Sequence, residues 1–308
     1  MIDVSIVIPT KDRADYLNRA IESVARQSVK NIELIIVDDG SKDRTKELVF
    51  ECKKKYNFPI AYIKNEKSFG GAKARNQGAK MATGKYLAFL DSDDEWERDH
   101  LKLGIGEIVS QNVDGIYGNY NTINENMNTN RRLKQKPEHL NFTEYILSGK
   151  GDTRTSTFIF KNIAFNKVKF DNLQAKHQDW DLAIRFSENY KLGFNVNNTV
   201  FLYEDIKNRM SYKMNHQATK YLLEKHGKNM SEEISARFYY LIAKDTLLIE
   251  GKNQYFLRYR RLSVNNYCKA FNFNMLIKDL KLFTFISLLF LPKRLFLTIY
   301  NIRYAKRN

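Results

Sequence analysis

Short apolar runs alternate with amphipathic stretches over the N-terminal part of the chain. Brief runs rich in β-branched residues are typical of buried strands, whereas apolar residues recurring at about 3.6 positions are typical of helices. Strands are therefore predicted at Val4–Pro9, Ile32–Val37, Ile60–Ile63 and Tyr86–Leu90, and helices at Ala14–Gln27, Asp43–Lys55 and Ala72–Met81. Strands separated by helices form parallel sheets. The pattern predicts an α/β fold with a mostly parallel central sheet flanked by helices.

Beyond Asn215, the spacing of hydrophobic residues along the sequence becomes typical of helices. Packed antiparallel helices are predicted at Ala218–His226, Ser231–Glu250 and Gln254–Phe271. We therefore predict an α/β domain over residues 1–210, with halves of about 1–100 and 101–210, and a helical, basic C-terminal extension over 211–308. The polar stretch Asn119–Lys136 is either an exposed loop that closes over a site or a disordered insertion.

Composition narrows the class of protein. The chain has 308 residues, of which 43% are hydrophobic and 13% aromatic, which excludes a disordered or fibrous protein. Two cysteines are too few for a disulfide framework and fit a reducing compartment. Val4–Pro9 has no basic residues before it, so the start of the chain is expected to be a strand and not a signal peptide. The apolar run Leu282–Leu291 is too short to span a bilayer, so no transmembrane helix is expected. The protein is expected to be cytoplasmic.

The net charge of +16 is concentrated near the C-terminus. Residues 251–308 contain twelve Lys or Arg and one acid, Asp279. Cations beside short apolar stretches predict that residues 275–308 lie on an anionic membrane, which would place the protein peripherally on the inner face of the cell membrane. The alternative is an apolar core or dimerisation helix with a solvated basic face, which leaves a homodimer open. Aromatic and arginine residues at 255–267 suit RNA stacking, but no RNA-binding module accompanies them, so no nucleic acid partner is expected.

The four predicted N-terminal strands end in Pro9-Thr10, Asp38-Asp39, Asn65 and Asp91-Ser92-Asp93-Asp94. Three of these four endings are acidic or polar, and two of them are acidic clusters. Ligands of parallel sheets bind beyond the carboxyl ends of the strands. Acidic clusters at the ends of apolar strands are not needed for sheet stability, so these positions are candidates for a binding site.

The two acidic strand ends each allow two interpretations. Asp91 and Asp93 can face one Mg²⁺ or Mn²⁺ ion that bridges to a diphosphate, or they can cap the following turn. A carboxylate of Asp38-Asp39-Gly40-Ser41 can accept a hydrogen bond from the imide of uracil, or it can cap the helix that opens near Asp43. The segment Gly70–Asn76 offers a helix N-terminus and two cations to a phosphate, which alone is a weak signal.

A third acidic segment, His177–Leu182, opens a predicted amphipathic helix. A carboxylate of Asp179 or Asp181 that reaches the strand ends would remove a proton from an acceptor hydroxyl. The alternative is that these acids only complement the helix dipole.

Five motifs, in this order along the chain, resemble those of the inverting glycosyltransferases of family 2, which have the GT-A fold. The motifs are Val4–Thr10, Val37–Ser41, Gly71–Asn76, Asp91–Asp94 and Gln178-Asp179. The resemblance runs from about Val4 to Leu182. It departs from the family pattern at Gln178, where the usual pair is Glu-Asp. Neither Trp96 nor Trp180 follows an arginine, so the Gln-x-x-Arg-Trp motif of processive members is absent and a single addition is expected.

The resemblance implies transfer of one sugar from a UDP-sugar to a hydroxyl of a saccharide acceptor, with Mn²⁺ or Mg²⁺ as cofactor. It implies an acceptor that is a lipid-linked oligosaccharide in bacterial capsule, O-antigen or related surface-glycan synthesis. Carried over residue by residue, it assigns Pro9 and Thr10 to the nucleoside, Asp39 to uracil, Asn65 and Arg75 to the base or phosphates, Asp91, Ser92 and Asp93 to ribose, donor sugar and metal, and Asp179 to the general base. His177 would order the acceptor loop.

Two other classes share some of these features. A sugar nucleotidyltransferase also has a nucleotide-binding α/β domain and metal-binding carboxylates, but it does not need a carboxylate at Asp179. A non-catalytic nucleotide-sugar-binding protein would tolerate loss of the acids.

Overall fold

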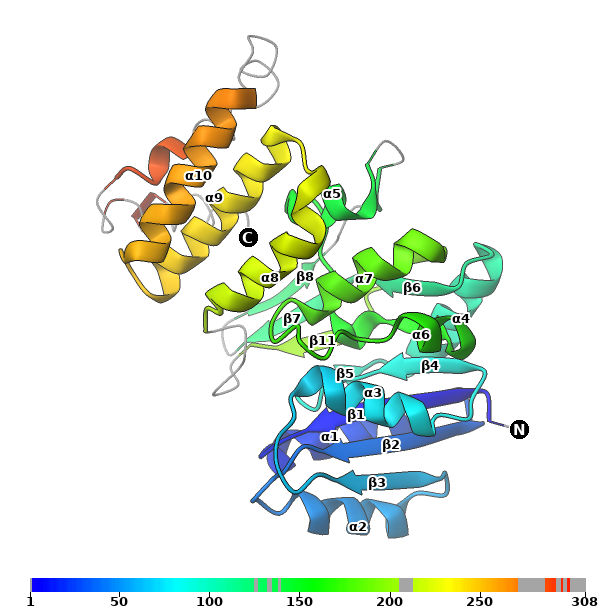
Figure 1. Cartoon of the computed structure of the whole chain (residues 1–308). Coiled ribbons are helices and arrows are strands. Elements are labelled where there is room, and N and C mark those ends of the chain that lie inside the picture. The colour runs from blue at the N-terminus through cyan, green and yellow to red at the C-terminus, as the bar shows by residue number, and fades with distance from the viewer. Residues whose placement is uncertain are drawn as a thin grey trace. The chain divides into compact units, whose positions relative to one another are not determined.

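A seven-stranded sheet of order β10-β6-β9-β4-β1-β2-β3 lies at the centre of the N-terminal part of the computed structural model (Figure 1). Its predicted members β1 (Val4–Thr10), β2 (Ile32–Asp38), β3 (Ile60–Lys64) and β4 (Tyr86–Phe89) are parallel to their neighbours in this group. β6 (Gly115–Gly118) and β10 (Leu192–Asn195) are parallel to each other, and β9 (Ile159–Lys161) is antiparallel to β4 and β6. The prediction of a mostly parallel sheet is confirmed.

The structure describes residues 2–124, 127–131, 135–137, 140–204, 213–270, 286–291, 295 and 298–299. The chain forms two compact units. The first unit comprises Met1–Gln135 and Asp152–Lys207, and the second comprises Lys136–Gly151 and Asn208–Asn308.

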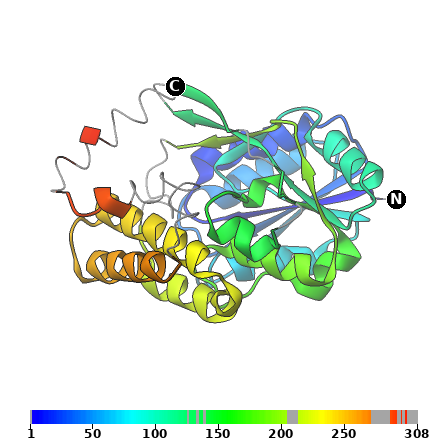
Figure 2. The same cartoon turned by 90° about the horizontal axis from the view of Figure 1, so that it is seen from above.

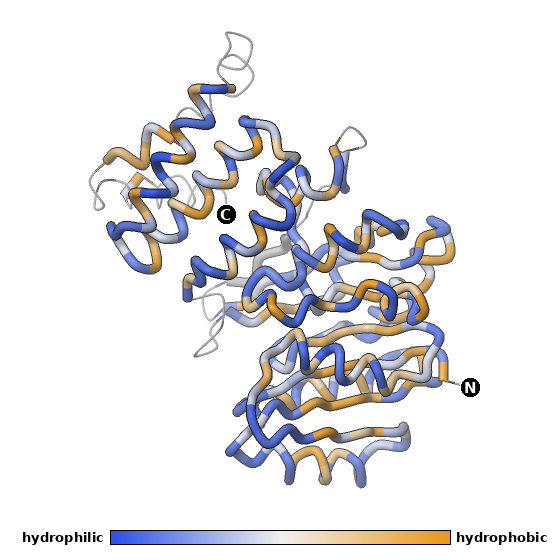
Figure 3. The backbone as a smooth tube through the Cα atoms, viewed as in Figure 1, coloured by the Kyte–Doolittle hydropathy of each residue, from blue (hydrophilic) through white to orange (hydrophobic). Residues whose placement is uncertain are grey.

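Both faces of the sheet are covered by helices (Figures 1 and 2). Side chains of a strand alternate between faces, and on β1 Ile6 and Ile8 lie in one buried core with residues of α1 (Ala14–Ala25), α2 (Thr45–Lys55) and α4 (His100–Ser110). Val7 points to the opposite face, against α3 (Gly71–Met81). Burial on both sides explains why these strands are continuously apolar, as the hydropathy colouring shows (Figure 3).

The predicted polar loop is partly a β-hairpin. β7 (Tyr120–Asn124) and β8 (Met127–Arg131) pair antiparallel and join β5 (Asp94–Trp96) and β11 (Val200–Tyr203) in a second sheet of order β5-β11-β7-β8. The expectation of an irregular segment is therefore wrong over these residues. Their sequence lacks the apolar alternation that identifies a strand, and backbone pairing with β11 organises the segment instead. The first unit also contains the short 3₁₀ helix η1 (Thr155–Thr157) and the helices α6 (Asn162–Val168) and α7 (Gln178–Asn189).

The second unit is helical. It contains α5 (Phe142–Leu147), α8 (His216–His226), the 3₁₀ helix η3 (Gly227–Asn229), α9 (Glu232–Ile249) and α10 (Gln254–Ala270). The predicted helices α8, α9 and α10 are confirmed, and α9 packs on α10 with the Ser263 hydroxyl donating to the Ala236 carbonyl at 2.8 Å.

Most of the predicted membrane-surface segment 275–308 lies outside the described residues. Within it, Ile286 and Leu289 are buried and Phe290 is exposed, under the guanidinium of Arg260. Among the helices of the described residues, none combines the length and the apolar character needed to cross a membrane. Ile286 and Leu289 therefore pack against other protein side chains. For these two residues this agrees with the alternative prediction of an apolar core helix.

Gly78 sets the distance between α3 and the sheet. A Cβ atom at this position would lie 2.5 Å from a methyl carbon of Val7 and 3.2 Å from one of Val37. Both valines belong to fully buried central strands, so little room exists for them to move.

We predict that Gly78→Ala destabilises the protein by about 1 to 2 kcal/mol, because overpacking outweighs the better helix propensity of alanine. Urea unfolding measures the change. Gly106→Ala is the matched control: Gly106 is exposed on α4 and no atom lies within 4 Å of the position of a Cβ, so the same substitution should stabilise by about 0.5 kcal/mol. Equal effects of the two substitutions would contradict this account.

Candidate active site at the carboxyl ends of the strands

The structure brings the polar strand ends into one row. Thr10 pairs with Asp38, and Asp38 with Lys64, at the ends of β1, β2 and β3. The row continues one residue further, because Asp39 donates its N–H to the Thr10 carbonyl and Asn65 donates to the Asp38 carbonyl, both at 2.8 Å. The candidate residues Pro9, Thr10, Asp39 and Asn65 therefore share one edge of the sheet.

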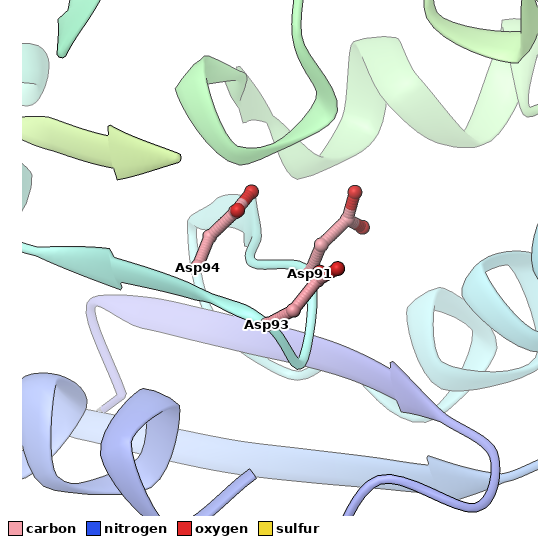
Figure 4. Close-up of side chains that lie close together, drawn as sticks. All are labelled: Asp91, Asp93 and Asp94. Atoms are coloured by element: carbon pink, nitrogen blue, oxygen red, sulfur yellow. The ribbon is translucent and has the colours of Figure 1, made fainter. Parts of the chain in front are cut away.

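Three carboxylates follow β4 in the next position of the row (Figure 4). Asp91, Asp93 and Asp94 each offer one oxygen, and these oxygens lie within 4.8 Å of one another. Oxygen ligands at such separations fit Mg²⁺ or Mn²⁺. The structure thus adds Asp94 to the predicted pair Asp91 and Asp93, and Ser92 is buried in the same turn.

Arginines neutralise two of these acids. The Arg75 guanidinium donates to Asp91 Oδ1 at 2.5 Å, and Arg13 pairs with Asp93, which is 5% exposed. Buried carboxylates are costly without a partner, so this turn depends on cations from outside it. Arg13 belongs to the loop before α1, and no motif in the sequence connects it with Asp93.

Ser156, in η1, holds the turn Asp91–Asp94, here called the acidic turn, in place. Its hydroxyl accepts the N–H of Asp91 at 3.1 Å and donates to Asp94 Oδ2 at 2.5 Å, while its carbonyl accepts the indole N–H of Trp96 at 2.7 Å. The turn is also closed by the Asp94 N–H, which donates to the Asp91 carbonyl at 3.0 Å. The turn is therefore held by the Ser156 hydroxyl and by its own backbone.

Asp39 organises the segment that precedes α3. Its carboxylate accepts hydrogen bonds from the Asn65 amide, the Ser68 hydroxyl and the backbone N–H groups of Phe69 and Gly70, at 2.6 to 3.1 Å. Burial alone would raise the pKa of Asp39, but these hydrogen bonds lower it below its ordinary value. Neither Asp38 nor Asp39 caps α2, since the Asp43 carboxylate accepts the Thr45 N–H at 3.1 Å.

Arg75 connects the strand ends to α7. One terminal nitrogen of its guanidinium, Nη1, donates to the side-chain oxygen of Gln178 at 2.8 Å, and the other, Nη2, donates to Asp91. Gln178 begins α7, and Asp179 follows it. The chain of contacts from Asp91 through Arg75 to Gln178 thus places the first turn of α7 next to the acidic turn. An amide oxygen at Gln178 accepts this bond as a carboxylate would, which explains how Gln178 can stand where the family has glutamate.

The surroundings of Asp179 differ from those of Asp181. Asp181 is fully buried and pairs with Arg185 at 2.7 Å, and Arg185 also donates to the Val168 and Lys169 carbonyls. This is a structural ion pair within α7. The Asp179 carboxylate accepts the N–H of Trp180 at 3.0 Å and lies near the charges of Arg154 and Asp152.

The pKa of Asp179 is raised to about 6. Burial is the main cause and the negative charge of Asp152 adds to it, whereas the positive charge of Arg154 opposes it. A carboxylate with this pKa is ionised at neutral pH yet more basic than an ordinary aspartate. Burial, assisted by Lys176 and Arg154, lowers the pKa of His177 to about 3, so its imidazole is neutral. His177 adopts a left-handed backbone conformation, with φ of 62°, and stacks on Trp180.

Comparisons with known proteins show the family and the fold of the chain. The family model described as Glycosyl transferase family 2 matches residues 5–174. Amylovoran biosynthesis glycosyltransferase AmsB of Erwinia amylovora is 34% identical over 200 residues, which are 63% of this chain and 65% of that protein. The UDP-Glc:alpha-D-GlcNAc-diphosphoundecaprenol beta-1,3-glucosyltransferase WfgD of Escherichia coli is 38% identical over 123 residues, which are 40% of this chain and 47% of that protein. The chain thus matches less than two thirds of the length of either relative.

Solved structures share the fold. S. aureus TarS 1–349 in complex with UDP-GlcNAc aligns with a TM-score of 0.58 and 19% identity, over 90% of this chain and 76% of that one. The mannosyltransferase PcManGT from Pyrobaculum calidifontis, in complex with GDP-Man and Mn²⁺, aligns with a TM-score of 0.54 and 16% identity, over 99% of this chain and 86% of that one. At these identities the likeness concerns the fold, and it confirms the predicted GT-A fold. Because the family model matches more than half of its residues, the chain belongs to glycosyl transferase family 2.

Proposed function

We propose that the chain is an inverting glycosyltransferase that transfers one sugar from a UDP-sugar to a hydroxyl of a saccharide acceptor. One observation carries the proposal: Arg75 joins Asp91, at the donor end of the sheet, to Gln178, the residue before Asp179. A group for the donor and a base for the acceptor are thereby held in one continuous arrangement.

The donor would bind along the row of strand ends. Pro9, Thr10, Asp39 and Asn65 lie where a nucleoside would rest against the edge of the sheet, and Arg75 provides a cation for the phosphates or base. The acids Asp91, Asp93 and Asp94 would hold a divalent ion, which offsets the charge of the departing diphosphate when it is bound. Mn²⁺ or Mg²⁺ suits these oxygen ligands.

Asp179 would act as the general base. The acceptor oxygen forms a bond to the anomeric carbon while the bond between that carbon and the diphosphate oxygen breaks, and the hydroxyl proton passes to the Asp179 carboxylate. UDP leaves from the opposite face, so the anomeric configuration inverts. With a pKa of about 6, Asp179 is ready to accept a proton at neutral pH.

The relatives suggest the biological setting. AmsB is named for amylovoran biosynthesis, and WfgD is named for transfer from UDP-Glc to a GlcNAc-diphosphoundecaprenol. By analogy we propose that this chain acts in bacterial surface-polysaccharide synthesis on a lipid-linked acceptor. A basic tail that holds the enzyme at the inner face of the membrane fits an acceptor of this kind.

We predict that Asp179→Asn reduces transfer by about 10²-fold or more with nearly unchanged UDP-sugar affinity, because the variant loses only the base. The measurement is release of UDP from a panel of UDP-sugars with Mn²⁺, paired with calorimetric binding. Asp181→Asn is the matched control. It should lower thermal stability by weakening the Arg185 pair and leave most of the transfer activity.

The same assay separates the other function classes. Slow release of UDP and free sugar marks a transferase. A nucleotidyltransferase would instead need added pyrophosphate and would form UTP and sugar 1-phosphate, and a binding protein would release nothing. Full activity in Asp179→Asn would remove Asp179 from the mechanism.

We predict that UDP binding depends on a divalent ion through Asp93. Without an ion, a diphosphate near three carboxylates is repelled. Asp93→Asn should lower UDP affinity in Mn²⁺ by about tenfold or more, which corresponds to about 1.4 kcal/mol. Glu97→Gln, an equal charge change at an exposed neighbouring acid, should not. Calorimetry in Mn²⁺ and in EDTA tests this, and equal UDP affinities of the unaltered protein in both would exclude the ion from donor binding.

We predict that the cations after residue 291 attach the protein to anionic membranes. The test is co-sedimentation with phosphatidylglycerol vesicles at low salt, where replacing these cations by glutamine should abolish binding. The control replaces the same number of exposed lysines in the first unit. If both proteins sediment alike, the tail has no special role in attachment. The tail positions are Lys293, Arg294, Arg303, Lys306 and Arg307, and the control positions are Lys42, Lys53, Lys54, Lys80 and Lys102.

A further inference from the structure

Asp152 joins three parts of the first unit through one carboxylate. Its Oδ2 accepts the Tyr120 hydroxyl of β7 at 2.6 Å and pairs with the Arg154 guanidinium at 2.9 Å. Its Oδ1 accepts the indole N–H of Trp180, in the first turn of α7, at 3.2 Å. Asp152 is 7% exposed.

The proposed mechanism does not use this carboxylate. It has no place in the row of strand ends and is not one of the three acids that follow β4. A second buried acid near Asp179 also opposes ionisation of Asp179. The Arg154 side chain is 42% exposed, and an ion pair with an exposed partner contributes little to stability, so stability alone does not explain Asp152 and Arg154.

Trp180 gives the network its connection to Asp179. Trp180 follows Asp179 directly, its N–H donates to the Asp179 carboxylate, and its ring stacks on His177. Fixing the indole at Asp152 therefore fixes the turn that carries Asp179. On the other side of this turn, Gln178 is held by Arg75.

We propose, on the basis of the proposed function, that Asp152 and Arg154 are positioning residues for Asp179. Asp152 anchors the turn through Trp180 and fixes Arg154 through their ion pair, and Arg154 provides the positive charge that acts on the Asp179 carboxylate. The two residues thus control both the orientation and the basicity of the base.

The charges around Asp179 predict opposite effects of two substitutions. The charged groups that act on it are Arg154 and Asp152, both from the segment before η1. Arg154 in turn interacts with Tyr120 of β7 and acts on His177, whose imidazole is neutral. Asp152→Asn keeps an acceptor for Trp180 but removes a negative charge and releases Arg154 from its partner, so the pKa of Asp179 falls. Arg154→Met removes the positive charge, so the pKa of Asp179 rises. Only deprotonated Asp179 can act as base, so activity is lost as the pH falls through its pKa.

The test is the pH profile of kcat/KM for UDP release from UDP-glucose and UDP-N-acetylglucosamine with Mn²⁺, using the full chain. The acidic limb should move to lower pH in Asp152→Asn and to higher pH in Arg154→Met, each by about one pH unit. Arg154→Lys keeps the charge and should restore the limb to its original position. Arg185→Met, which breaks an ion pair in the same helix, should leave the limb unmoved.

The outcomes separate the two hypotheses. Loss of activity in Asp179→Asn, together with limbs that move in opposite directions, supports the inference. If Asp179→Asn is inactive but the limbs of Asp152→Asn and Arg154→Met stay in place or move in the same direction, Asp152 and Arg154 have only a structural role and the inference is wrong. Undiminished activity of Asp179→Asn would overturn the proposed function itself. If Asp152→Asn does not fold, the comparison of Arg154→Met with Arg154→Lys still decides.

Discussion

Arg75 occupies the position on which the geometry of the site depends. It is 8% exposed, and its guanidinium holds Asp91 after β4 and Gln178 at the start of α7. α3 carries Arg75 and lies close against β1 and β2, because Gly78 has no side chain to separate them. Packing of a helix on the sheet thereby fixes the position of a buried charge, and this charge holds the turn Asp91–Asp94 next to the first turn of α7. Lysine could not replace this arginine, since one ammonium group lacks the rigid fork that reaches two partners in fixed directions.

Three acids in and near the site each have an arginine as a partner. Asp91, Asp93 and Asp152 each pair with an arginine, at Arg75, Arg13 and Arg154 respectively. Near Asp179, by contrast, burial exceeds the opposing effect of Arg154, so the pKa of Asp179 is raised. Asp179 thus differs from Asp91 and Asp93, because each of those two carboxylates has an arginine as a direct partner.

Local hydrophobic patterns were enough to predict the N-terminal strands and helices. Because β1 and β2 are buried on both faces of the sheet, their sequences are continuous apolar runs. The row of strand ends was also predictable, since parallel strands end at one edge. The roles of Arg13, Ser156 and Asp152 could not be predicted, because these residues contact partners that lie far away in the sequence. A hydrogen bond between distant segments leaves no characteristic residue spacing in the sequence. The hairpin of β7 and β8 was not predicted for a related reason. Its mostly polar residues form strands because their backbones pair with each other, and the sequence shows no apolar face that would indicate a strand. Asp152-Thr153-Arg154, an acid and a cation after Gly149 and Gly151, offered the only local signal for the network around Asp179.

The contacts of Asp39 constrain how a nucleotide base can be recognised. Five hydrogen bonds from residues 65 to 70 already use both carboxylate oxygens, which together offer about four acceptor positions. An imide N–H of uracil would therefore have to replace one of these donors, and the Ser68 hydroxyl can turn away at lower cost than a backbone N–H can. Such an exchange would change the segment that leads through Gly70 into α3. Because α3 carries Arg75, occupation of the base site and the position of the guanidinium at Asp91 and Gln178 would be mechanically connected through one helix.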